Sequence, residues 1–128
     1  MKMTKIYLAG AILEYDKKSI LWRSYIKDKL GSDKYIYLDP TIAEIALLRP
    51  SDIINTDKKM IDECDLVLVD WGKISAGTSM EMIYAWERGK KIYVIDSGAP
   101  MSIWIKYHSD IIFPSADYAI DGIGWNYG

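Results

Sequence analysis

The segment CDLVLVDWGKISAGTSME, residues 64–81, decides the fold of this chain. It contains the apolar run Leu66–Val69 between two aspartates, a pattern typical of a strand that is buried on both faces of a sheet. The loop Trp71–Gly77 follows, and the pattern then predicts a helix from about Ser79 to Arg88, which Gly89 ends. A buried strand that leads through a small-residue loop into a helix is typical of α/β proteins.

Four more apolar runs predict strands on either side of this segment, and helical patterns separate them. The strands are expected at Lys5–Ala9, Tyr35–Leu38, Ile92–Ile95 and Ile111–Phe113. Asp16 and Gly31 bound one expected helix, and another runs from Pro50 to about Cys64. Strands joined by helices pair in parallel through right-handed crossovers. We therefore expect an α/β fold in one domain over residues 1–128: a doubly wound, Rossmann- or flavodoxin-like sheet of five parallel strands with helices on both faces.

Composition excludes several classes of protein. The 128 residues carry 16 basic and 18 acidic side chains and are 50% hydrophobic, so the chain is neither disordered nor basic enough to coat a nucleic acid polymer. No apolar run reaches the roughly 20 residues of a membrane span, and the start has no signal-peptide pattern. Cys64 is the only cysteine, and with the only histidine, His108, it offers no zinc site. We expect a cytoplasmic protein without a metal.

Ligands of doubly wound sheets bind beyond the carboxyl ends of the strands, near the point where the strand order reverses. This rule directs attention to the residues that follow each strand. The candidate ligand contacts after the first two strands are Gly10, Ala11, Ile12 and Asp39. The segments 70–81 and 96–104 follow the third and fourth strands and belong to the same edge.

Asp57 lies in the apolar stripe of the helix expected over residues 52–64. This helix is expected to bury Ile53, Ile54, Met60, Ile61 and Cys64. Asp57 follows Ile53 by four residues and precedes Ile61 by four, so helical periodicity places it among these side chains. A buried carboxylate is costly unless it is paired or hydrogen-bonded. Two interpretations stay open: Asp57 accepts hydrogen bonds from backbone amides of its own helix, or it is a functional acid above the strand ends.

Glu81 is a second candidate, at the start of the helix that follows the best strand. Amides at a helix N-terminus can hold an anion, and the candidate contacts here are Ser75, Gly77, Thr78 and Ser79. The helix dipole favours the charged form of Glu81, which a nucleophile requires. Thr78 and Glu81 also fit a capping box, which would be purely structural. Tyr7, in the first strand, is either a core residue with a satisfied hydroxyl or a third site residue.

Six motifs in order cover nearly the whole chain: Lys5–Ile12, Leu38–Pro40, Asp57, Cys64–Asp70, Ser75–Glu81 and Gly89–Ile95. This set resembles the nucleoside 2-deoxyribosyltransferase superfamily, which includes deoxynucleoside 5′-monophosphate N-glycosidases. The resemblance implies that Glu81 is the nucleophile that attacks the anomeric carbon of the sugar. It implies that Asp57, 24 positions earlier, is a general acid or base near the leaving base, and that Tyr7 orients Glu81. No organic cofactor is implied.

Ser75 is the position that distinguishes substrates within the superfamily. Transferases that act on free nucleosides tend to have an aspartate there, whereas monophosphate glycosidases have a serine, since a carboxylate would repel the phosphate. The resemblance therefore implies cleavage of the N-glycosidic bond of a nucleoside 5′-monophosphate. The glycosidases place an arginine where this chain has Leu13, and Arg23 is a candidate replacement. Ser102 and Ser109 are both candidates for the phosphate-binding serine that a neighbouring subunit lends.

The resemblance also implies at least a homodimer with shared sites. The aromatic segments Met101–Tyr107 and Trp125–Tyr127 fit such an interface, or else pack against their own domain. The chain has ten Tyr and five Trp but one Phe, and three of these rings are expected near the strand ends as a stacking surface for a base: Trp71, Tyr84 and Trp104. Three alternative functions stay open: exchange of bases by transfer, non-catalytic sensing of a nucleotide, and cleavage of NAD-like dinucleotides.

Overall fold

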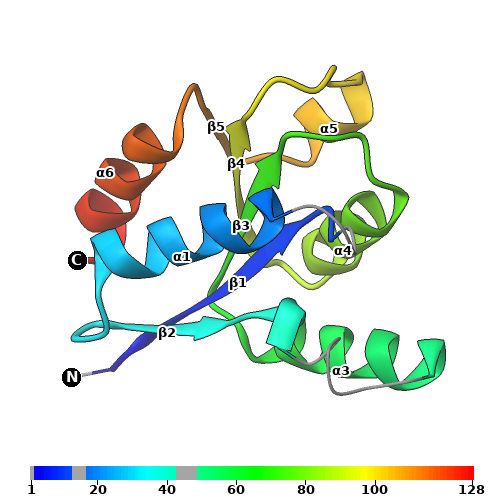
Figure 1. The fold of residues 1–128 in the computed structure, drawn as a ribbon, viewed down its shortest axis with the longest axis horizontal. Coiled ribbons are helices and arrows are strands. Elements are labelled where there is room, and N and C mark those ends of the chain that lie inside the picture. Colours follow the sequence, from blue (N-terminus) through cyan, green and yellow to red (C-terminus); the bar gives the residue numbers. More distant parts are fainter. Residues whose placement is uncertain (1, 13–16, 43–48) are drawn as a thin grey trace.

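The computed structural model describes residues 2–12, 17–42 and 49–128, in which strands and helices alternate (Figure 1). The strands are β1 (Thr4–Gly10), β2 (Tyr35–Leu38), β3 (Leu66–Trp71), β4 (Lys91–Asp96) and β5 (Ile111–Phe113). The described helices are α1 (Lys18–Leu30), α3 (Pro50–Glu63), α4 (Ala76–Glu87), α5 (Ile103–Tyr107) and α6 (Ala116–Tyr127). Among these helices, none is both long enough and apolar enough to cross a bilayer.

The five strands form one sheet in the order β2-β1-β3-β4-β5, and every neighbouring pair is parallel. The prediction of a doubly wound α/β sheet is therefore confirmed. The chain moves from β1 outward to β2, and then crosses back to place β3 on the other side of β1. The order thus reverses between β1 and β3, which makes the carboxyl ends of these two strands the expected ligand-binding edge.

Helices cover the sheet in two layers (Figure 1). Alternate residues of each strand face one layer or the other. Tyr7 and Ala9 of β1 point to the layer that contains α3, α4 and α5, whereas Ile6 and Leu8 point to the layer of α1 and α6. The same alternation continues in β3 and β4. Because both faces are covered, the middle of each central strand is apolar, as the run Leu66–Val69 predicts.

Helix α3 lies beside α4, but its apolar stripe is only partly buried (Figure 1). Ile61 and the capping residue Cys64 are in the core, whereas Ile54 is 53% exposed. The prediction that Ile54 is buried is therefore wrong. The side chains of α3 that pack against the sheet therefore lie toward its C-terminal end, whereas Ile54 is open to solvent.

Helix α4 begins at Ala76, three residues before the predicted start at Ser79. Ser75 is its N-cap, and the Ser75 Oγ atom accepts a hydrogen bond from the Thr78 amide at 3.2 Å. The predicted capping box between Thr78 and Glu81 is therefore wrong, and Glu81 lies in the second turn. Small residues are weak helix formers, which hides this first turn in the sequence, but a serine cap is sufficient to start it.

Two of the described helices occupy positions where the sequence predicted none. Helix α6 starts at Ser115, whose hydroxyl accepts a hydrogen bond from the Tyr118 amide, and it buries Ala119 and Ile123 against the sheet. Helix α5 is a single short turn. The glycines of α6 weaken its helical pattern, so tertiary packing rather than local preference stabilises it.

Helix α1 agrees with its prediction at the C-terminal end, where Gly31 adopts a φ of 73° and the helix stops at Leu30. The predicted cap, Asp16, lies outside the described residues.

Candidate active site

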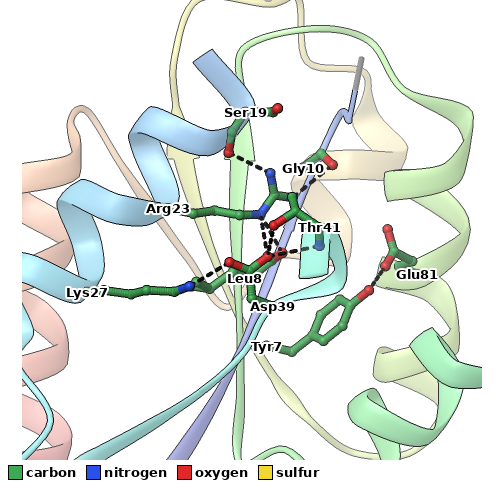
Figure 2. Close-up of polar contacts among 9 residues, drawn as sticks. All are labelled: Tyr7, Leu8, Gly10, Ser19, Arg23, Lys27, Asp39, Thr41 and Glu81. Carbon is green, nitrogen blue, oxygen red and sulfur yellow. Dashed lines mark hydrogen bonds and ion pairs between the residues drawn. The ribbon is translucent and has the colours of Figure 1, made fainter. Parts of the chain in front are cut away.

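Tyr7 and Glu81 meet at the carboxyl ends of the strands. The Tyr7 ring is fully buried in β1, and its hydroxyl donates a hydrogen bond to Oε2 of Glu81 in α4 (Figure 2). Burial raises the pKa of Tyr7, and Glu81 and Asp57 raise it further when they carry a negative charge. Tyr7 therefore stays protonated and acts as a hydrogen-bond donor to the carboxylate of Glu81.

Asp57 lies near Tyr7 and Glu81. Its charge acts on the Tyr7 hydroxyl, and its Oδ1 atom is buried. Asp57 and Glu81 both line a cleft of about 460 Å³ between α3 and α4. The structure thus brings together the three side chains that the sequence singled out as catalytic candidates.

One face of each helix lines this cleft. Helix α3 contributes Ile54, Asp57, Lys58 and Ile61, and α4 contributes Gly77, Met80, Glu81, Ile83, Tyr84 and Glu87. Lys58 and Glu87 were not among the site residues predicted from the sequence. The signal that would have found Lys58 is helical spacing, since Ile54, Asp57, Lys58 and Ile61 follow the i, i+3, i+4, i+7 pattern of a single face.

The small residues at the start of α4 are used mainly to build the helix. Thr78 is buried, and its hydroxyl donates to Ser75 Oγ at 3.0 Å. The Ser79 hydroxyl donates to the Ser75 carbonyl at 2.9 Å. Of the four predicted ligand contacts in this segment, Gly77 lines the cleft beside the carboxylates. Ser75 is half-buried at the helix N-terminus, where an anion is favoured by the helix dipole.

The predicted contacts after β1 differ in exposure. Gly10 is buried, Ala11 and Ile12 are half-buried, and Leu13 lies outside the described residues. A Cβ atom at position 10 would come within 3.1 Å of the Trp22 ring and 3.3 Å of the Asp70 carbonyl. Gly10 is therefore required for the close approach of α1 and β3 to the end of β1.

Asp39, the predicted contact after β2, is not open to a ligand. It is 8% exposed, and its Oδ2 atom accepts a hydrogen bond from Lys27 at 2.6 Å. Its Oδ1 atom accepts from the amide and the hydroxyl of Thr41 at 2.9 and 2.5 Å. The position of Asp39 therefore supports a structural role rather than contact with a substrate.

Arg23, the candidate replacement for a phosphate-binding arginine, points away from the cleft. It is 1% exposed, and its guanidinium donates to the carbonyls of Leu8, Gly10 and Ser19 (Figure 2). A guanidinium held in this way has no path to a ligand in the cleft between α3 and α4. The position of Arg23 therefore does not support a phosphate-binding role.

The three predicted stacking rings have different surroundings. Trp71 is buried, and its indole donates to the Pro100 carbonyl at 2.9 Å, so it belongs to the core rather than to a base pocket. Tyr84 lines the cleft, and the Arg88 guanidinium lies 3.3 Å from the centre of its ring. Trp104 is exposed on α5 and lines a second cleft of about 310 Å³ beside α4.

Two carboxylic acids and a tyrosine beside one cleft can perform displacement at a sugar carbon. In retaining glycosidases, one carboxylate attacks the anomeric carbon while the other carboxyl group transfers a proton. Within the described part of the chain, no three His, Cys, Asp or Glu side chains gather closely enough to bind a metal ion. The cleft holds the two carboxyl groups that such a displacement uses, Asp57 and Glu81.

Known proteins share the fold and the motifs. The profile of the nucleoside 2-deoxyribosyltransferase family matches residues 6–120. The structure of the 2-deoxyribosyltransferase from Bacillus psychrosaccharolyticus is similar with a TM-score of 0.76 at 17% identity, over 92% of this chain and 91% of that one. That of the 2-deoxyribosyltransferase from Leishmania mexicana gives a TM-score of 0.75 at 17% identity, over 98% and 99% of the two chains.

A CMP N-glycosidase from Clostridium botulinum is also similar, with a TM-score of 0.68 at 17% identity, over 95% of this chain and 99% of that one. A comparison with curated protein sequences gave no match. At these identities the three solved structures support the fold, and the family profile covers most of the chain. The chain belongs to the nucleoside 2-deoxyribosyltransferase family of enzymes.

Proposed function

We propose that this protein cleaves the N-glycosidic bond of a (2′-deoxy)nucleoside 5′-monophosphate through a covalent glycosyl-enzyme intermediate on Glu81. The observation that carries the proposal is the hydrogen bond from Tyr7 to Glu81, at a cleft that Asp57 also lines. A hydrogen-bond donor on one oxygen of the Glu81 carboxylate orients the other oxygen for attack. The second carboxyl group, that of Asp57, can supply the proton that the leaving base requires.

In the first step, a carboxylate oxygen of Glu81 attacks the anomeric carbon as the carbon–nitrogen bond to the base breaks. The electron pair of that bond leaves with the base, and Asp57, in its protonated form, donates a proton to the base. The transition state has oxocarbenium character, so the negative charge of Glu81 stabilises it before the ester bond is complete. The Tyr7 hydroxyl holds Glu81 in the attacking orientation throughout.

In the second step, water attacks the same carbon and displaces Glu81. Asp57, now a carboxylate, accepts the proton of this water. Each step inverts the anomeric carbon, so the sugar 5-phosphate leaves with the original anomeric configuration. The proton balance closes, because the proton given to the base in the first step is regained in the second. The proposed cycle needs no cofactor.

The proposed preference for a phosphate rests on Ser75 at the N-cap of α4. An anion at this end of the helix is favoured by the helix dipole, whereas an aspartate would add a like charge beside the phosphate. Ser75→Asp tests this directly, because aspartate is as good an N-cap as serine and leaves the helix intact.

We expect Ser75→Asp to lower kcat/KM for deoxynucleoside monophosphates by about tenfold or more, the equivalent of one charge-assisted contact, and to spare free deoxynucleosides. Chromatographic measurement of released base over a panel of ribo- and deoxyribonucleotides and their nucleosides gives both values. Faster turnover of the free nucleosides by the wild-type protein would contradict the phosphate preference.

Base transfer is the second candidate function, because the family profile that matches the chain is that of deoxyribosyltransferases. A second base rather than water would then attack the glycosyl ester. Incubation of a deoxynucleotide with an isotopically labelled free base distinguishes the two. Labelled nucleotide forms if transfer competes with hydrolysis, and only the sugar phosphate and free base form if it does not.

We also propose that a second copy of the chain completes the site. Apolar side chains are exposed on α4 and α5: Met80, Trp86, Ile103, Trp104 and Tyr107. Of the two serines that could reach a partner's phosphate, Ser109 donates its hydroxyl to the Ile105 carbonyl at 2.6 Å, whereas Ser102 is exposed and its side chain makes no cap hydrogen bond. We therefore favour Ser102.

Co-expression of Glu81→Gln and Ser102→Ala chains tests the shared site. A hybrid dimer contains one site with both lesions and one with neither, so the mixture should exceed the average activity of its two parents. Activity equal to that average, or a monomer by light scattering, would exclude a shared site.

A further inference from the structure

Strand β1 is longer than β2 at the edge where the site lies. The pairing of β1 with β2 ends at Tyr7 and Leu38, whereas its pairing with β3 continues as far as Gly10 and Asp70. Residues 8–10 therefore have a strand neighbour on one side only. Leu8 and Gly10 are two residues apart, so their carbonyls point to the same side of the strand.

Arg23 of α1 occupies the place where β2 would have continued. Its Nε atom donates to the Leu8 carbonyl and its Nη2 atom to the Gly10 carbonyl, both at 3.2 Å (Figure 2). Its Nη1 atom donates to the Ser19 carbonyl at 2.8 Å, which ties the same guanidinium to its own helix. One side chain thus provides the donors for both open carbonyls at the end of β1.

Asp39 and Trp22 hold Arg23 in this position. The Asp39 Oδ1 atom lies 3.8 Å from Arg23 Nε, and Lys27 binds the other oxygen of the same carboxylate. The Trp22 ring lies against the guanidinium at 4.7 Å and also contacts Gly10. A buried ion pair of this kind contributes little net stability, because the cost of desolvating its charges offsets their attraction.

Residues 8–10, where Arg23 binds the Leu8 and Gly10 carbonyls, begin immediately after Tyr7. Tyr7 donates to Glu81 on the opposite face of the sheet, so the path of β1 sets the position of its hydroxyl (Figure 2). The negative charge of Glu81 also acts electrostatically on Arg23. The two sides of β1 are therefore coupled through the strand itself and through charge.

We propose that Arg23 is a positioning residue, which fixes the carboxyl end of β1 and thereby holds the Tyr7 hydroxyl against Glu81. Arg23 does not contact the substrate and acts through Tyr7. The consequence for the reaction proposed above, on which this inference rests, is a role in turnover rather than in substrate binding.

The test is a double-mutant cycle between Arg23 and Tyr7. Arg23→Gln should lower kcat by about tenfold to a hundredfold, the cost typical of a misplaced catalytic group, with KM within about twofold of wild type. In a Tyr7→Phe background, the same substitution should lower kcat less than about threefold, because the hydroxyl it positions is already gone. Ile26→Ala, which truncates a buried side chain of the same helix, is the control for lost stability and should leave kcat unchanged.

Arg23→Lys is the second variant if Arg23→Gln does not fold. It keeps a positive charge beside Asp39, but an ammonium group cannot reproduce the fork that spans the Leu8 and Gly10 carbonyls. It should therefore show the same loss of kcat. Three outcomes would overturn the inference and leave Arg23 a role in stability alone. The loss of kcat is equal in the wild-type and Tyr7→Phe backgrounds, a folded Arg23 variant keeps the wild-type kcat, or neither Arg23 variant folds.

Amide hydrogen exchange provides a measurement that needs no substrate. In the Arg23 variants, exchange should accelerate at residues 8–10 more than elsewhere in the sheet, whereas the lost stability of Ile26→Ala should accelerate exchange evenly over the sheet. Unchanged exchange at residues 8–10 would overturn the inference. If the wild-type protein instead releases no base from any nucleotide, the proposed function fails. Failure of the proposed function and failure of the inference about Arg23 are therefore distinguishable.

Discussion

The two sides of β1 use charge in opposite ways. On the α1 side, Arg23 and Lys27 place two cations beside the buried carboxylate of Asp39, and the arginine donates its hydrogen bonds to backbone carbonyls. On the α4 side, Asp57 and Glu81 line an open cleft of about 460 Å³ beside the Tyr7 hydroxyl. Strand β1, which carries Tyr7 and the Leu8 and Gly10 carbonyls, runs between the two sides (Figure 2).

The two sides differ in whether their carboxylates stabilise the structure or are open to a ligand. A carboxylate that is enclosed by cations and hydrogen-bond donors is stabilised in its charged form and has no room for a ligand, as at Asp39. Carboxylates at a cleft are accessible to a ligand and to its protons. Substitutions on the α4 side should therefore affect chemistry, and those on the α1 side stability and positioning.

Glu81→Gln should produce the largest effect. The amide keeps the size of the side chain but removes the nucleophile, so base release should fall by about a thousandfold or more. Glu87→Gln is the matched control, because Glu87 lines the same cleft from the same helix. Comparable losses in both variants would show that the cleft needs negative charge in general rather than a nucleophile at position 81.

Asp57→Asn should follow, with a loss of about a hundredfold to ten-thousandfold in base release. The loss should shrink for a sugar phosphate with an activated leaving group, such as a nitrophenolate, which leaves without a proton. Glu63→Gln, an exposed change on the same helix, should have no effect. An equal loss for both leaving groups would exclude proton transfer by Asp57.

Tyr7→Phe should cost about tenfold to a hundredfold in kcat, the value of one hydrogen bond to a charged group. The ring stays in the core, so the melting temperature should change little. Steady-state kinetics and a thermal melt measure both quantities. A large drop in the melting temperature with unchanged kcat would make Tyr7 a core residue only.

Asp39→Asn tests the α1 side and should affect turnover least. Burial tends to raise the pKa of Asp39, but the hydrogen bonds from Lys27 and Thr41 more than offset this, so the pKa is lowered. The unfolded chain therefore binds this proton more tightly, and the contribution of Asp39 is present above the ordinary carboxyl pKa of about 4 and is lost as the pH falls through the lowered value.

Denaturant unfolding at several pH values measures this contribution. At pH 7, Asp39→Asn should lower the free energy of unfolding by about 3 kcal/mol, the cost of removing one partner of a buried ion pair. The gap to the wild type should narrow as the pH falls below the ordinary carboxyl pKa of about 4 and through the lowered pKa of Asp39. A gap that stays constant or widens would show that Asp39 is not held as a charged group.

The strands of the sheet could be predicted from the sequence, because each strand is an apolar run between residues that end strands. Val67 and Val69 lie in a strand that is covered on both faces, and such strands are visible without any knowledge of their neighbours. The first turn of α4 was missed because Ser75, Gly77 and Thr78 are weak helix formers in isolation. Helix α6 was missed because it is stabilised by packing against the sheet rather than by its own residues.

The site was predictable where a polar residue interrupts an apolar pattern, as Asp57 does in α3. The role of Arg23 was not predictable, because it depends on β2 ending before β1 does, a property of the register between two strands. The surroundings of Trp71 and Asp39 likewise depend on distant residues such as Pro100 and Lys27. Local patterns therefore identified the candidate residues, and only the tertiary structure separated the side chains at the cleft from those that are buried or held by other residues.

The central claim is a covalent intermediate on Glu81. The most direct measurement is mass spectrometry of the protein after rapid acid quenching during turnover of a deoxynucleoside monophosphate, or after treatment with a 2-fluoro-sugar analogue that slows the second step. We expect a mass increase of one sugar phosphate, located by peptide mapping at Glu81 and absent from Glu81→Gln. A label on another residue, or full product formation with no labelled protein at any time, would contradict the account.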